Sequence, residues 1–60
     1  MAKIGDTIRI ISMYGEPQYD DKTGIIEEIG IDPYGDEYMR GTWGGCSVYT
    51  KLDKFEIINP

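Results

Sequence analysis

Glycine, proline and aspartate interrupt this sequence so often that no stretch of ten residues keeps the apolar spacing of an α-helix. Short alternating stretches remain, as in DTIRIIS (6–12), where Ile8 and Ile10 share one face while Thr7 and Arg9 share the other. Successive side chains of a β-strand point to opposite faces, so this alternation indicates strands. The chain is predicted to be all-β, with no helix longer than one turn.

Five strands are expected from the stretches between these interruptions, at residues 6–12, 23–31, 37–43, 46–50 and 54–58. DPYG (32–35) predicts a type I turn, because Asp, Pro and Gly stand at its first, second and fourth positions. Gly44 and Gly45 predict a two-residue primed hairpin turn. KLD (51–53) predicts a single helical turn before the last strand.

The second expected strand breaks the alternation. Ile26 and Ile29 are three residues apart, so a regular strand would point them to opposite faces. A β-bulge near Glu27 or Glu28 would bring both isoleucines into the core and leave the acids outside.

The length of 60 residues predicts one domain, 1–60, with a small core. The single Cys cannot form a disulfide within the chain, and there is no His. Closing the sheet would remove exposed strand edges without such covalent or metal support. We therefore predict a small SH3-like five-stranded barrel with a long loop after the first strand.

RGTWGGCSV (40–48) holds the only Trp and the only Cys. A catalytic Cys needs a base and an electropositive setting, and the chain has no His, so Cys46 is predicted to be structural. Gly41 shares a strand face with Trp43 and is predicted to make room for a bulky neighbour. Trp43 is predicted to lie in or beside the core, the alternative being a flat surface for a ligand.

Eleven acidic and six scattered basic residues give a net charge of −5, which lowers the expectation of nucleic-acid binding. The acidic pairs do not have the spacing of a calcium loop, so no metal or other cofactor is predicted. No enzymatic activity is predicted, because a His base is missing and a chain this short leaves little room for a cleft. No membrane segment or secretory signal is visible, and a cytoplasmic location is expected.

The loop at 14–22 is longer than a connection between two strands requires, and long loops are often functional. Tyrosine offers a large contact area at low entropic cost, and acids can attract a basic residue of a partner. The alternative is that the rings only cover one end of the barrel. The predicted binding surface consists of Tyr14, Glu16, Pro17, Tyr19, Asp20 and Asp21.

Over nearly its whole length the chain resembles a small bacterial and phage family catalogued as domain of unknown function 4314. The resemblance lies in GDTIRI, GEP with Tyr19, KTGIIEEI, GTWGG and DKFEII. It implies an SH3-type barrel and no known activity, while KTGIIEEI is also similar to KOW-like modules of translation and transcription proteins. The expected function is a non-enzymatic binding module for a protein or peptide partner, and the alternative is a KOW-like nucleic-acid-associated module.

Overall fold

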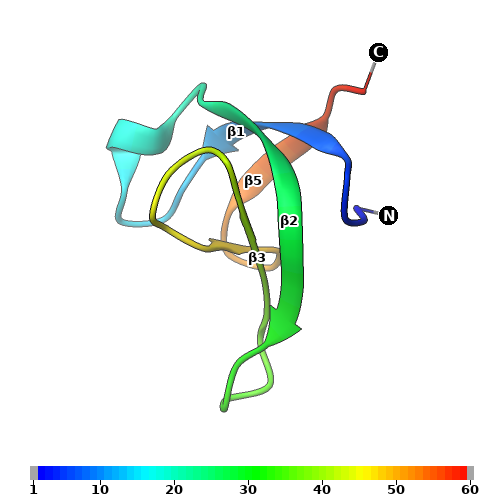
Figure 1. Ribbon diagram of the computed structural model, residues 1–60. Helices are drawn as coiled ribbons and strands as arrows, with labels where there is room; N and C mark the ends of the chain where they lie inside the picture. The colour runs from blue at the N-terminus through cyan, green and yellow to red at the C-terminus, as the bar shows by residue number, and fades with distance from the viewer. Residues whose placement is uncertain (1, 60) are drawn as a thin grey trace.

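The computed structural model describes residues 2–59 and shows an all-β protein (Figure 1). Its five strands form one antiparallel sheet in the order β4-β3-β2-β1-β5. Their bounds are β1 Thr7–Ser12, β2 Thr23–Ile31, β3 Glu37–Gly41, β4 Val48–Tyr49 and β5 Lys54–Ile57. The only helix in residues 2–59 is a 3₁₀ turn, η1 (Pro17–Tyr19), inside the loop after β1.

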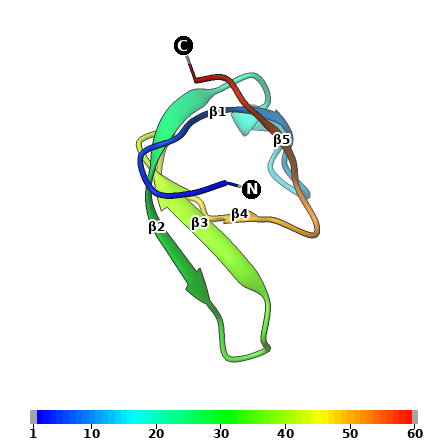
Figure 2. The same ribbon diagram turned by 90° about the vertical axis from the view of Figure 1, so that its right-hand side faces the viewer.

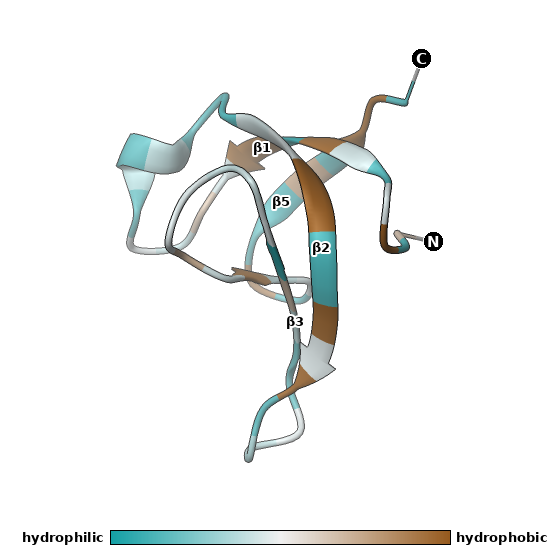
Figure 3. Cartoon of the chain, in the orientation of Figure 1, coloured by the Kyte–Doolittle hydropathy of each residue, from teal (hydrophilic) through white to brown (hydrophobic). Residues whose placement is uncertain are grey.

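Strand β2 holds the sheet together, because its first part pairs with β1 and its second part with β3. The register shifts between Ile26 and Glu28, which confirms the predicted bulge. Ile26 is buried, and Ile29 packs against the core from a partly buried position. Along β2 a hydrophilic band lies between hydrophobic ones (Figure 3).

The sheet curves around a single core (Figure 2). Seven buried side chains form it: Ile8, Ile10, Met13, Ile26, Met39, Trp43 and Val48. Strands β4 and β5 stand at opposite ends of the strand order, so the paired strands of residues 2–59 form an open sheet. The all-β prediction is confirmed, whereas the closed barrel is not.

The predicted hairpin at Gly44 and Gly45 is wrong. β3 ends at Gly41 and β4 begins at Val48, so six residues connect them, and of the two glycines only Gly44 has a positive φ, of 142°. The reason is Trp43, which turns inward until it is only 4% exposed and takes the backbone out of the strand ladder. Its ring lies over Gly41, where a Cβ atom would approach it to 2.5 Å, so the predicted role of Gly41 is confirmed.

The two other predicted turns are present. Gly35 N–H donates to the carbonyl of Asp32 at 3.0 Å, and the Asp32 carboxylate accepts the N–H of Tyr34 at 2.9 Å. Before β5, the N–H groups of Leu52 and Asp53 both donate to the Tyr49 carbonyl, at 3.1 and 2.9 Å. The predicted helical turn is thus a single hydrogen-bonded turn that does not extend into a helix.

No helix within residues 2–59 has the length and apolar character needed to cross a membrane.

Candidate functional site

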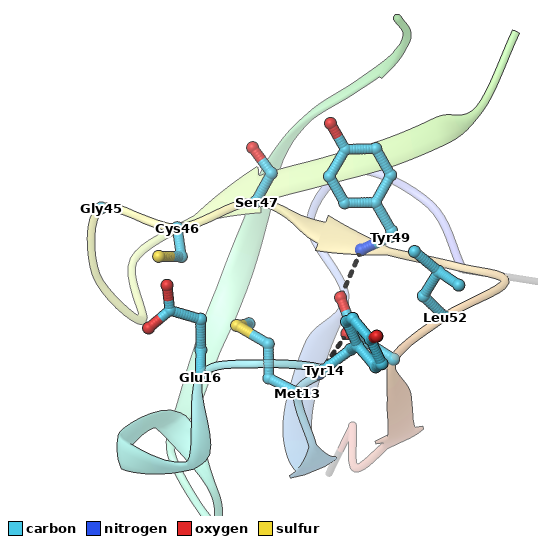
Figure 4. A pocket seen from close by; sticks show the side chains of 9 residues that line it. Met13, Tyr14, Glu16, Gly45, Cys46, Ser47, Tyr49 and Leu52 are labelled. Carbon is cyan, nitrogen blue, oxygen red and sulfur yellow. Dashed lines mark hydrogen bonds between the residues drawn. The ribbon is translucent and has the colours of Figure 1, made fainter. Parts of the chain in front are cut away.

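A pocket of about 450 Å³ opens where three loop segments meet (Figure 4). The first segment follows β1, the second precedes β4, and the third runs from β4 into the turn before β5. Nine residues line the pocket: Met13, Tyr14, Glu16, Gly45, Cys46, Ser47, Tyr49, Leu52 and Asp53. Its volume falls within the range of small-ligand pockets, about 300–1,000 Å³.

Asp53 fixes two walls of this pocket. It is only 8% exposed, and its Oδ1 accepts the N–H of Tyr14 while its Oδ2 accepts the N–H of Tyr49, both at 2.7 Å. Figure 4 shows both bonds as dashed lines. One carboxylate therefore ties the loop after β1 to strand β4, and a buried acid is tolerated because both of its oxygens are hydrogen-bonded.

The third wall is held from the core. Trp43 Nε1–H donates to the Cys46 carbonyl at 2.8 Å, which places residues 45–47 along the pocket. Cys46 is half-buried and packs against the core, in line with its predicted structural role. Its side chain raises the pKa of the neighbouring Tyr19 through hydrogen bonding, and partial burial of Tyr19 acts in the same direction.

The structure places two of the six predicted binding residues in the pocket. Tyr14 lines it while remaining 78% exposed, and Glu16 lines it with a half-buried side chain. Gln18 donates to the Glu16 carboxylate from the same loop.

The other four predicted residues lie outside the pocket, although Pro17, Asp20 and Asp21 are exposed. Tyr19 turns inward and packs against the core. Asp20 accepts the N–H of Met13 at 3.4 Å, and Asp21 forms an ion pair with Arg9 at 2.8 Å. Both acids thus have partners within the protein, so they are less free to attract a binding partner than the sequence suggested.

Seven of the residues that line the pocket were not predicted from the sequence. Met13 directly precedes the long loop, and the other six come from residues 45–53, far from that loop in the sequence. Leu52 carried a local signal, since a large apolar residue in a short polar turn is exposed, here by 63%. Tyr49 had no such local signal. The position of its side chain depends on the register of β4 with β3, in which Tyr49 pairs with Tyr38. Burial is the main cause that raises the pKa of Tyr49, followed by the charge of Asp32.

The charged side chains that line the pocket are both acidic. Its two carboxylates come from Glu16 and Asp53, and no lysine or arginine is among its lining residues. Within residues 2–59 no cluster of three His, Cys, Asp or Glu side chains is arranged to hold a metal ion. The geometry favours contact with an apolar or cationic group.

No family model, curated protein or solved structure matches this chain. The resemblance to domain of unknown function 4314 therefore stays a prediction.

Proposed function

We propose that this protein is a non-enzymatic binding module for a protein or peptide partner, and that the pocket beside Asp53 is its binding face. The observation that carries the proposal is the pairing of two exposed apolar side chains, Tyr14 and Leu52, on the walls of one pocket. Large apolar side chains left in water beside a concave surface are typical of interaction sites.

The bonding of Asp53 supports this proposal. Because its two oxygens accept the backbone N–H groups of Tyr14 and Tyr49, the backbone at both tyrosines is held in place before any partner arrives. Binding then costs less ordering entropy than it would on a free loop. Tyrosine suits the role because it combines a large apolar area with a polar tip.

We extend the proposal to the fold and the location. The strand order, the bulge in β2 and the long loop after β1 support an SH3-like barrel. In such a barrel the two end strands meet at one core, and here Val48 of β4 lies in the buried cluster while Phe55 of β5 packs against it. A single cysteine without a disulfide partner supports a reducing compartment such as the cytoplasm.

Selection from a displayed library of random peptides tests the proposed binding face. Peptides selected on the wild-type protein should lose about tenfold or more in affinity for Tyr14→Ala and for Leu52→Ala, because truncating an exposed anchor removes contact area. Tyr34→Ala is the matched control, since Tyr34 is 90% exposed but lies in the turn at the far end of the β2–β3 hairpin (Figure 1). Equal losses in all three variants, or no selected peptide at all, would contradict the proposal.

A further inference from the structure

The two pocket carboxylates differ in how far their hydrogen-bonding capacity is used. Asp53 has both oxygens occupied by backbone N–H groups at 2.7 Å. For Glu16 the one bond found is that from the Gln18 side chain. A carboxylate offers about four acceptor positions, so Glu16 retains capacity for a further donor inside the pocket.

The residues that line the pocket differ in character from one end of it to the other. In Figure 4 the Glu16 carboxylate lies at one end, near the Cys46 thiol. Tyr14, Tyr49 and Leu52 gather toward the other end. The pocket is thus an apolar trough that ends in a carboxylate.

We propose that this trough takes the side chain of a lysine or arginine from a peptide partner. The apolar stem lies along Tyr14 and Leu52, the tyrosine rings add cation–π attraction, and the cationic head donates to Glu16. Because the occupant is a peptide side chain, this inference rests on the proposed function.

Charge argues for a cation over an anion. An anionic occupant such as a phosphate would face two carboxylates with no lysine or arginine in the pocket wall. The net charge of −5 adds a long-range attraction for basic peptides and a repulsion for acidic ones. Arg9, a cation of the neighbouring strand, is already paired with Asp21 and Glu56 at 2.8 Å each.

The test compares two synthetic peptides of one Gly/Ser sequence, carrying lysine or acetyl-lysine at the same positions. Acetylation removes the charge and keeps the stem, so the acetylated peptide should bind about tenfold more weakly or worse. Cys46 supplies an independent readout, because it is the only cysteine and lines the pocket. Its alkylation by iodoacetamide should slow as the lysine peptide is added.

A pair of charge variants separates a local contact from net charge. Glu16→Gln should weaken the lysine peptide by about tenfold, in the range for a hydrogen bond to a charged group. Glu27→Gln makes the same change of net charge at an exposed position of β2 outside the pocket, and should change the affinity less than about twofold.

Two results would overturn the inference and leave the proposed function standing. One is equal binding of the lysine and acetyl-lysine peptides, which would mean that the trough binds the side chain without recognising its positive charge. The other is an equal loss in Glu16→Gln and Glu27→Gln, which would mean that only the overall charge attracts the peptide. If neither these peptides nor any library peptide binds, the proposed function fails together with the inference.

Discussion

Tyr14 and Tyr19 stand in the same loop but face different environments. The 3₁₀ turn that begins at Pro17 brings the Tyr19 ring against Gly44, where a Cβ atom would lie only 2.7 Å from it. Tyr14 precedes that turn, and its backbone is held by Asp53 while its ring stays exposed. The loop therefore uses one tyrosine for packing and offers the other to solvent.

Single substitutions should separate these two roles. Tyr19→Ala is expected to lower the free energy of unfolding by about 1–3 kcal/mol, because it removes a ring packed on the core. Tyr14→Ala should change it by less than about 0.5 kcal/mol, as is usual for exposed positions. Urea unfolding followed by Trp43 fluorescence measures both values. A destabilisation by Tyr14→Ala as large as that by Tyr19→Ala would show that both rings belong to the core.

At the scale of elements, the loop after β1 is fastened at both of its ends. Asp21 N–H donates to the Ile10 carbonyl at 2.7 Å, and Ile10 N–H donates to the Lys22 carbonyl at 2.8 Å. Asp53 holds the other end through Tyr14 N–H. The loop is thus an extension of the sheet, which explains how it can present a pocket wall.

Asp53→Asn tests this fastening. An asparagine has only one acceptor oxygen, so its NH₂ group would face the N–H of either Tyr14 or Tyr49. We expect a loss of about 1–3 kcal/mol of stability, the usual cost of an unsatisfied buried donor. Hydrogen exchange at the Tyr14 and Tyr49 amides should quicken together. Asp20→Asn, which alters a carboxylate that is exposed and accepts only a longer bond, from the Met13 N–H, should cost much less. Unchanged protection in Asp53→Asn would refute the role given to this carboxylate.

The elements were predictable from sequence where local rules decide them. The alternation around Ile8 and Ile10 located β1, and the spacing of Ile26 and Ile29 located the bulge. The connection at 42–47 was not predictable, because the burial of Trp43 over Gly41 overrides the local preference of Gly44 and Gly45 for a tight turn.

The candidate site was predictable only in part, for the same reason. Tyr14 and Glu16 stand in a long loop and could be selected by composition. Their partners Tyr49 and Leu52 reach the pocket through strand pairing and a turn nearly forty residues further along the chain. Contacts of that kind depend on the tertiary structure, which a local pattern does not contain.

At the scale of the whole molecule, the two ends of the described chain are joined beside β1. Asn59 Nδ2 donates to the buried carboxylate of Asp6 at 2.9 Å, and Asn59 Oδ1 accepts the N–H of Thr7 at 2.7 Å. The hydrogen bond from Asn59 is the main cause that lowers the pKa of Asp6, and Lys3 contributes through its backbone N–H and its side chain.

This link predicts a pH dependence. Because the pKa of Asp6 is lower in the folded protein than in the unfolded chain, its contribution to stability is complete above the unfolded pKa and is lost as the pH falls through the folded pKa, below about pH 4. Asn59→Ala should raise the folded pKa of Asp6 and move acid unfolding to higher pH. The carboxyl carbon shift of Asp6, followed during an acid titration, measures this. A wild-type Asp6 that titrates at or above its ordinary pKa would contradict the assignment.

The most direct test of the central claim, that the pocket beside Asp53 is a peptide-binding face, is amide chemical-shift mapping of the wild-type protein. Pools of short peptides, RNA and DNA are added in turn at physiological salt. We predict saturable shifts with peptides, concentrated at residues 13–16, 45–47 and 49–53, and none with either nucleic acid. Saturable shifts with RNA or DNA, or peptide shifts concentrated on the β2–β3 hairpin and absent from the pocket, would contradict the account.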